Sequence, residues 1–554
     1  MAERQPPDDD ETPGDGDPPR DAGDPSAVLD SAHVGDIQGA FGTIREHDLD
    51  SRRTWTARLL TLLAIMGPGL IVMVGDNDAG GVATYSQAGQ NFGLSLLWVL
   101  PLLIPVLVVN QEMVVRLGAV TGVGHARLIN ERFGKFWGAF SVGDLFILNF
   151  LTIATEFIGV SLALSYFGIS EYVSVPLAAV GLVAMTATGS FRRWERFMFI
   201  FIAVNFLVIP LAFLSHPSGG SFIHGLVTPG VHGGWNSTSV LLVIAIVGTT
   251  VAPWQLFFQQ SNIVDKRITP RWINYERADT VIGSLITVFA AALLMAVVAA
   301  AFAGTSYFGH FVNAGTVAAG LQHQVGRAAG AIFAIILLNA SIIGAASVTL
   351  STSYAFGDVF GAHHSLHRGW RDAKFFYGAF TAMVVVAAGI VIIPGAPLGV
   401  ITTGVQALAG VLLPSATVFL LLLCNDRQVL GPWVNRLWLN ILAGVIVSVL
   451  LMMSLVLMIT TVFTTIDVTV LAAVLGAVLL VFYLVAGVVL FLRRGTREPV
   501  PVVPMERKAN WRMPQLSLLE RPTWSRGRLV GMWGLRLYLV AAVLLLLVKA
   551  IELG

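Results

Sequence analysis

The sequence predicts an all-α polytopic membrane protein with about 13 transmembrane helices. Hydrophobic residues make up 55% of the 554 residues, charged residues only 12%, and the mean hydropathy is +0.75. Because soluble domains carry about 25% charged residues, this composition excludes a soluble protein. Two apolar segments, the first and the sixth, are interrupted near their middle by glycine, proline or polar residues. The composition predicts a helical bundle, and the interruptions predict a site inside it.

Residues 1–53 differ from the rest of the chain. They hold 14 Asp and Glu against five Arg, a net charge of −9, while the whole chain has a formal charge of +1. They are rich in Asp, Pro and Gly, so we expect a disordered acidic cytoplasmic tail. No apolar core of a signal peptide is present. A short apolar patch, residues 34–44, could dock on the membrane domain, but composition favours a solvated linker.

Thirteen apolar segments are long enough to cross about 30 Å of hydrocarbon. They cover residues 59–91, 94–115, 136–166, 173–190, 195–214, 239–260, 278–303, 328–356, 373–394, 398–424, 436–463, 467–493 and 531–551. Arg and Lys gather in alternate connections, such as residues 116–135 and 266–277. The positive-inside rule then predicts a plasma-membrane protein with a cytoplasmic N-terminus and an external C-terminus.

The first apolar segment is interrupted between Met66 and Tyr85, where Asp76, Asn77 and Asp78 precede a glycine pair. A charge at that depth costs about 2.5 kcal/mol or more, so such residues usually face a partner, a cavity or an ion. Glycines let the helix unwind, and freed backbone carbonyls are tolerated only where they line a buried site. We interpret this segment as half of a cation site.

The sixth segment is interrupted in the same way. Gly248-Thr249-Thr250 is followed by Ala252-Pro253-Trp254, and proline both removes an amide donor and disfavours helix at the residue before it. Interrupted spans five apart are typical of an inverted-repeat (5+5, amino-acid-transporter-like) secondary transporter with discontinuous helices 1 and 6. Two ordinary kinked helices are the alternative, and the carboxylates of the first span favour a site.

Three motifs in order resemble the NRAMP divalent-metal transporters. Residues 67–69 (Gly-Pro-Gly) and 78–81 (Asp-Ala-Gly-Gly) look like the family's first-helix signature, written there Asp-Pro-Gly-Asn. Residues 248–261 are similar to its sixth helix, and residues 425–440 to the stretch between helices ten and eleven. The resemblance spans residues 57–493. It implies a transport domain of twelve helices over residues 54–493, followed by a cytoplasmic linker (494–530) and an additional transmembrane helix (531–554).

The resemblance also implies a set of metal ligands. Asp78 matches the metal-binding aspartate, Gln406 a tenth-helix amide, and the carbonyls of Gly75 and Thr249 the freed backbone ligands. Glu156 matches an acidic residue of helix three. These positions keep the site lined with oxygen atoms.

Several positions depart from the family pattern. Gly81 stands where the family has an asparagine, and Ala252 where it has a methionine. Trp254 replaces the family's histidine, and Ile153 replaces an aspartate linked to proton movement. Asp76 and Asn77 are polar residues that the typical pattern lacks, and we expect them to add oxygen ligands. Losing the soft thioether favours hard cations, and the smaller side chains widen the cavity for a partly hydrated ion. The pattern resembles the NRAMP-related branch that carries Mg²⁺ and Mn²⁺.

Proton coupling should be weak or absent. Histidine changes charge most readily near neutral pH. Here an apolar residue replaces both the family's sixth-helix histidine and its third-helix aspartate, so two groups that could relay protons are missing. Glu156, Asp144 and Glu112 remain possible proton carriers. Asp144 is expected either to line the exit route or to bond two helices, and Trp254 to be a gate rather than plain packing.

Other functions fit less well. A proton-coupled Mn²⁺/Fe²⁺ transporter of the conventional type is the main alternative, and a sodium-coupled amino acid symporter is disfavoured because Asp76 and Asp78 would repel a substrate carboxylate. An enzyme is not expected, since the histidines fall in tails or loops and Cys424 is solitary.

His363, His364 and His367 are interpreted as a solvated turn. We expect a monomer in the lipid bilayer, with a divalent metal ion as substrate, no cofactor and no nucleic acid.

Overall fold

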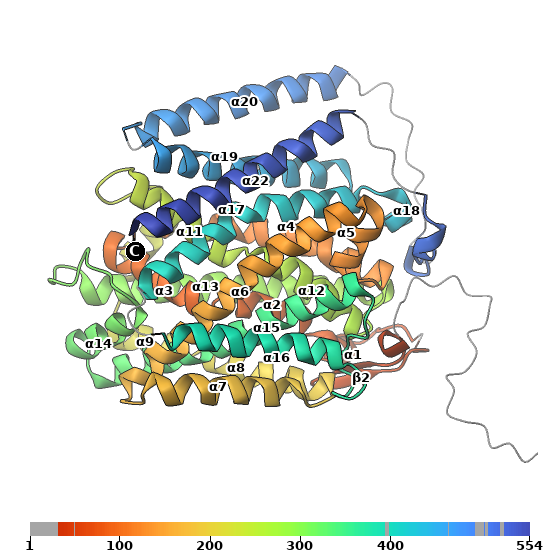
Figure 1. The fold of residues 1–554 in the computed structure, drawn as a ribbon, viewed down its shortest axis with the longest axis horizontal. Helices are drawn as coiled ribbons and strands as arrows, with labels where there is room; N and C mark the ends of the chain where they lie inside the picture. The colour runs from red at the N-terminus through yellow and green to blue at the C-terminus, as the bar shows by residue number, and fades with distance from the viewer. Residues whose placement is uncertain are drawn as a thin grey trace, which may run out of the picture.

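The computed structural model describes residues 31–48, 50–393, 398–463, 465–492, 504, 508–520 and 526–553. Long helices run side by side through the molecule, and one small β-hairpin lies at the end of the bundle near α1 (Figure 1). Most of the acidic segment predicted to be disordered, residues 1–30, lies outside the described residues.

The elements of the first half are η1 (Ser31–His33), β1 (Ile37–Gly39), β2 (Gly42–Ile44), α1 (Trp55–Ile65), α2 (Pro68–Gly75), α3 (Ala79–Phe92), α4 (Val99–Thr121), α5 (His125–Phe133), α6 (Lys135–Tyr166), α7 (Glu171–Thr186), α8 (Phe191–Asn205), α9 (Val208–Ser215), α10 (Gly219–Val227), α11 (Ser237–Thr250) and α12 (Pro253–Asp265). Those of the second half are η2 (Pro270–Trp272), α13 (Ile273–Phe302), α14 (Ala314–Gln324), α15 (Arg327–Phe360), α16 (Lys374–Val391), α17 (Leu398–Cys424), α18 (Arg427–Leu430), η3 (Gly431–Trp433), α19 (Leu437–Val462), α20 (Val468–Leu492), η5 (Leu516–Leu518) and α22 (Arg526–Leu553).

The all-α polytopic membrane fold is confirmed. Within the described residues, ten helical segments are long and apolar enough to cross a membrane, or 11 if the bent pair α1–α2 counts as one span. Two shorter apolar helices, Glu171–Thr186 and Leu529–Ala541, correspond to the other predicted spans. The predicted number of 13 is therefore reached only when the bent and the short helices are included.

Both predicted interruptions are present. The first span is interrupted twice: α1 and α2 meet at a 54° bend, and α2 and α3 are separated at Asp76–Asp78. At the bend, Gly67 has φ +153°, a conformation that favours glycine. The second interruption separates α11 from α12 just before Pro253. Around the breaks, α13 packs on α2 and α3, α11 packs on α17, and α15 packs on α6.

The prediction of a solvated linker over residues 34–44 is wrong. Strands β1 and β2 pair antiparallel, with Ile37 opposite Ile44, and both isoleucines are buried. At the hairpin tip the Ala40 N–H donates to Glu195 Oε2 at 2.5 Å. A backbone donor that satisfies a buried carboxylate, together with two buried isoleucines, outweighs the polar composition of the segment. We call the end of the bundle that carries this hairpin the hairpin face; it is the end predicted to be cytoplasmic.

The hairpin is connected to the α1–α2 bend by buried polar contacts. Glu195 forms an ion pair with Lys266 at 2.6 Å, and neither side chain is exposed. Lys266 also donates to the carbonyl oxygens of Ile65 (2.7 Å) and Met66 (2.9 Å), which lie at the bend. Removing one partner of a buried pair leaves an uncompensated charge, so this network holds the inner end of the first span in place.

Two further segments differ from expectation. The described part of the predicted linker packs on the bundle, because the Trp433 indole N–H donates to the Lys508 carbonyl (2.9 Å) and Arg132 donates to the Glu520 carbonyl (2.6 Å). The additional helix α22 begins at Arg526, before the predicted start, and packs on α17 and α19 (Figure 1).

The histidine predictions need two corrections. His364 is buried and lies 3.1 Å from Asp358, so the turn after α15 is not fully solvated, although His363 is exposed. His125 begins helix α5 and is buried against Gln260, whereas a loop position was expected. A buried polar partner holds each ring: Asp358, six residues away, for His364, and the distant Gln260 for His125.

Candidate functional site

Asp78 lies at the centre of the first interruption. It is the N-cap of α3, its Oδ1 accepts the Gly81 N–H at 2.7 Å, and only 2% of its surface is exposed. Aspartate is a strongly preferred cap because it satisfies amides that a helix start leaves free. The break between α2 and α3 therefore places this carboxylate inside the bundle with one oxygen bonded to its own helix.

Glu156 of α6 is an acidic neighbour of Asp78. Its Oε2 accepts the Ala79 N–H at 3.1 Å, and the two carboxylates are close enough to interact electrostatically. Gly344 of α15 backs both of them, since a Cβ there would lie 2.6 Å from the Glu156 carboxyl carbon and 2.7 Å from the Asp78 Cβ. Two neighbouring carboxylates repel each other unless a cation or a proton lies between them. The pair can therefore attract a cation.

Gln406 reaches the same region from α17. Its side-chain amide packs directly on Gly80, where an added Cβ would overlap it. Gln406 is 2% exposed, and its Nε2 has no hydrogen-bond partner among the residues that the structure describes. An unpaired amide is rare in a buried position. It leaves this side chain free to turn its oxygen toward an ion.

Two backbone carbonyls are released by the interruptions. In a continuous helix the Ala79 N–H would bond to Gly75, but it donates to Glu156 instead. The carbonyl of Thr249 lacks its helical donor because residue 253 is proline. The Thr249 side chain is buried, and its Oγ1 has no partner in the described part of the chain. Both predicted carbonyl ligands thus lie at the breaks.

Asp76 and Asn77 face other helices. Gln255 of α12 donates to Asp76 Oδ1, while the Asp76 Oδ2 has no partner within the described ranges. The Asn77 amide donates to the Thr287 carbonyl of α13 at 3.1 Å. The sequence prediction did not include Gln255. A signal was available, because Gln255 is a polar residue only two positions after Pro253 in an apolar span.

The predicted pathway residues lie around the second break. Ala252 is the N-cap of α12, and the Trp254 ring is 1% exposed and packs against Gly75. The Trp254 carbonyl accepts the Ser351 hydroxyl at 3.0 Å. Gly81 is in close contact with the Asp76 carbonyl and Thr249, so a side chain there would narrow the site. Trp254 is thus packed at the break between α11 and α12.

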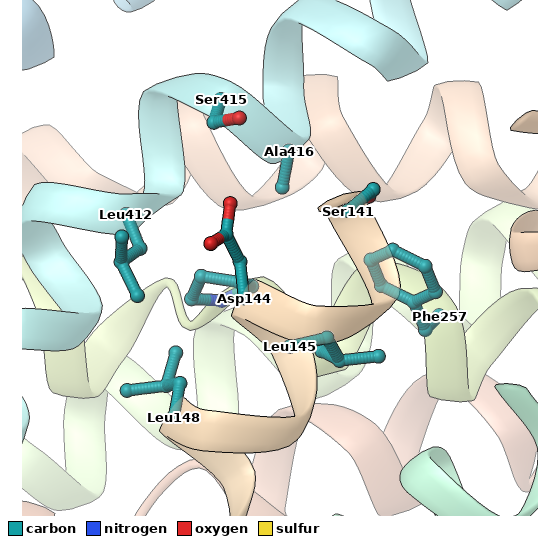
Figure 2. A pocket seen from close by; sticks show the side chains of 9 residues that line it. Ser141, Asp144, Leu145, Leu148, Phe257, Leu412, Ser415 and Ala416 are labelled. Atoms are coloured by element: carbon teal, nitrogen blue, oxygen red, sulfur yellow. The ribbon is translucent and has the colours of Figure 1, made fainter. Parts of the chain in front are cut away.

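Asp144 lies apart from this group, in a pocket of about 20 Å³ (Figure 2). The pocket is lined from α6, α12 and α17, and the Asp144 carboxylate points toward α17 between Leu412 and Ala416 (Figure 2). Such a volume holds about one water molecule. A smaller pocket beside Ala79 and Thr402 lies toward the other end of the bundle.

The site is closed from both sides. Asp76, Asp78, Glu156, Thr249 and Gln406 are each at most 2% exposed, so an ion can enter or leave only if helices move. Within the described residues no three His, Cys, Asp or Glu side chains converge as a metal cluster. The candidate site therefore consists of two carboxylates, Asp78 and Glu156, with an amide and backbone oxygens around them. Such ligands suit a hard cation.

Known proteins resemble this chain over most of its length. The family model described as "Natural resistance-associated macrophage protein-like" matches residues 69–460. The "Divalent metal cation transporter MntH" of Bacillus subtilis (strain 168) is 28% identical over 408 residues, covering 70% of this chain and 89% of that protein. "Divalent metal cation transporter MntH 1" of Pseudomonas aeruginosa is 30% identical over 413 residues, with the same coverage of 70% and 89%.

A solved structure agrees with the fold. The manganese transporter of Eremococcus coleocola, crystallised with an aromatic bis-isothiourea substituted compound, superimposes with a TM-score of 0.58 at 21% identity. The superposition covers 81% of this chain and 98% of that one. The family model covers well over half of the chain, and the chain therefore belongs to the Natural resistance-associated macrophage protein-like (NRAMP) family.

Proposed function

We propose that this protein is a secondary transporter that carries divalent metal cations, Mg²⁺ and/or Mn²⁺, across the plasma membrane. Its family membership and its similarity to divalent metal cation transporters support the substrate class. The closed site between two interrupted spans supports an alternating-access mechanism, in which the ion binds near the midplane. The metal is the substrate, and the proposal includes no cofactor and a monomeric protein.

The observation that carries this proposal is the chemistry of the groups around Asp78. The Glu156 carboxylate lies beside Asp78, and the Gln406 amide and the Thr249 hydroxyl border Gly80 and Gly81 in the first turn of the same helix. The positions where a soft or titratable ligand is expected are Ala252 and Trp254. Carboxylate, carbonyl and water ligands suit Mg²⁺ and Mn²⁺, whereas thioethers favour softer transition metals. The site should therefore accept a hard, partly hydrated ion.

Weak or absent proton coupling is part of the proposal. Trp254 and Ile153 cannot carry protons, so the ion would move down its own gradient and the membrane potential. For a divalent ion, a potential of 100 mV contributes about 4.6 kcal/mol. A proton-coupled Mn²⁺/Fe²⁺ transporter remains the second candidate, and the contact between Asp78 and Glu156 favours it, because a shared proton could sit where the ion binds. The same carboxylates disfavour an amino acid symporter.

Uptake into proteoliposomes tests the proposal. Purified protein is reconstituted, and Mg²⁺ and Mn²⁺ entry are compared while the internal pH is recorded, for the parent and for Asp78→Ala. We expect both ions to enter, the internal pH to stay constant and the variant to be inactive. Entry of Mn²⁺ alone, with acidification that follows it, would establish the conventional proton-coupled mechanism instead.

A further inference from the structure

An arginine of the additional helix lies inside the membrane domain. Arg536 of α22 is 5% exposed, and its guanidinium carbon lies 3.5 Å from the ring centroids of both Phe136 and Trp137. The rings of Phe140 and Trp533 lie at 4.6 and 5.3 Å. Burying a charge without an ion pair is costly, and the faces of aromatic rings compensate that cost only in part. Such a residue is expected to act on a charged partner.

The electrostatic partner is Asp144. Residues 137, 140 and 144 follow one another at helical spacing on one side of α6, so the guanidinium lies one to two turns from this carboxylate. The two groups interact electrostatically, although no direct ion pair between them is present in the described part of the chain. The Nε and Nη2 of Arg536 and the Oδ2 of Asp144 are buried without hydrogen-bond partners among the described residues. Both charges are therefore incompletely satisfied.

The Asp144 pocket lies directly beyond the second interruption. Its walls include Pro253 and Phe257, the first and fifth residues of α12, and Leu412 and Ser415 of α17 (Figure 2). Helix α12 runs from the break to Asp265, next to the Lys266 network of the hairpin face. An ion that leaves the Asp78 region along α12 toward that face would reach Asp144 next. The carboxylate points into this pocket, toward α17 (Figure 2).

We propose that Asp144 is a second position for the transported cation, between the Asp78 site and the hairpin face, and that Arg536 is a positioning residue that weakens the hold of Asp144 on the cation. This inference rests on the proposed function. Arg536 does not touch the ion; its fixed charge offsets that of the carboxylate and speeds release. Because α22 lies outside the family-matched residues 69–460, the Arg536–Asp144 interaction involves a helix that is not part of the matched transport domain.

The test is a double-mutant cycle in proteoliposomes. Initial rates of Mn²⁺ and Mg²⁺ uptake are measured over a range of concentrations for the parent, Arg536→Gln, Asp144→Asn and the double variant. With Arg536→Gln we expect both the maximal rate and KM to fall by roughly three- to tenfold, because a more tightly held ion leaves more slowly. In the Asp144→Asn background the same change should have almost no effect, since no carboxylate is left to act on.

Arg536→Lys is the matched variant. It keeps the positive charge and loses the planar stacking, so it should remain within about twofold of the parent if charge is what matters. An Arg536→Gln effect that is equal in both backgrounds, or an Arg536→Lys loss as large as that of Arg536→Gln, would overturn the inference and assign Arg536 a packing role. Monodisperse elution and unchanged thermal unfolding of each variant exclude a failure to fold. If the parent itself carries neither ion, the proposed function fails rather than this inference.

Discussion

Asp76 and Asp78 are only two residues apart, yet they belong to different surroundings. Residues two apart do not share a helix face, and the break between α2 and α3 separates them further. Asp78 faces Glu156 of α6 and the region that Gln406 reaches from α17. Asp76 accepts a hydrogen bond from the neutral side chain of Gln255 on α12. We infer that these two carboxylates, although close in the sequence, do not hold the ion together.

These different surroundings suggest different roles for the two carboxylates. A second carboxylate lies beside Asp78, and an unpaired amide borders the first turn of its helix, so this region offers the charge and the oxygen ligands that a divalent cation needs. Beside Asp76 the only polar side chain bonded to it is the amide of Gln255, among the described residues. We infer that Asp78 holds the ion, while Asp76 contributes mainly to the packing of α12 against the break.

Asp78→Asn is expected to have the largest effect. Asparagine can still cap α3, so the helix start is preserved while the charge is lost. Groups that merely orient a metal ligand typically change affinity 10- to 100-fold, so loss of a direct carboxylate should reduce Mn²⁺ or Mg²⁺ uptake by about 100-fold or more. Uptake by proteoliposomes measures this. Asp467→Asn, at an exposed cap before α20, is the control and should transport normally. Uptake by Asp78→Asn at more than about a tenth of the parent rate would contradict our assignment.

Gly80→Ala tests the position of Gln406. The new methyl group would overlap the Gln406 amide and displace it, although alanine suits a helix better than glycine does. We expect uptake to fall on the order of tenfold while the protein stays folded, because the displaced group is the flexible end of a side chain. Gly404→Ala, two residues from Gln406 on α17, meets no atom within 4 Å and should be silent. Equal rates in the two variants would show that Gln406 is not a ligand.

The interruptions could be predicted from the sequence because their causes are local. Pro253 removes a donor wherever it stands, and the polar residues between Gly75 and Gly81 do not suit an apolar helix. Contacts between distant residues could not be derived in this way. The neighbourhood of Asp78 and Glu156 was available only through the family resemblance, and the contact between Asp76 and Gln255 was not predicted at all.

The hairpin shows the same limit. Its residues are individually unremarkable for a linker, and what fixes them is Glu195, a buried carboxylate 155 residues away that accepts the Ala40 N–H. Composition describes a segment but not its partner. The same holds for Arg536, the charged partner of Asp144, because nothing in the sequence of its helix indicates what that helix contacts.

Glu156→Gln sharpens the role of the carboxylate pair. Glutamine can still accept the Ala79 N–H through its carbonyl oxygen, so the start of α3 should be kept. Loss of one of two charges near the ion should raise KM by roughly fivefold, with a smaller change in the maximal rate. Concentration-dependent uptake with simultaneous recording of internal pH separates the possibilities. If the parent acidifies the lumen and this variant does not, Glu156 carries a proton, and the contrast with Asp76, which is bonded to a neutral amide, becomes one of proton transfer.

Asp76→Asn should have the smallest effect of the four. The amide of Gln255 can turn to bond with an asparagine, so the hydrogen bond between α12 and the break is kept. We expect uptake within about threefold of the parent, with thermal stability equal or slightly higher, because burying an amide is less costly than burying a charge. Gln255→Leu should then lower stability in the parent, where it leaves the buried carboxylate unbonded, more than in the Asp76→Asn background. A loss of transport as large as that of Asp78→Asn would show that both aspartates hold the ion, as the sequence alone suggested.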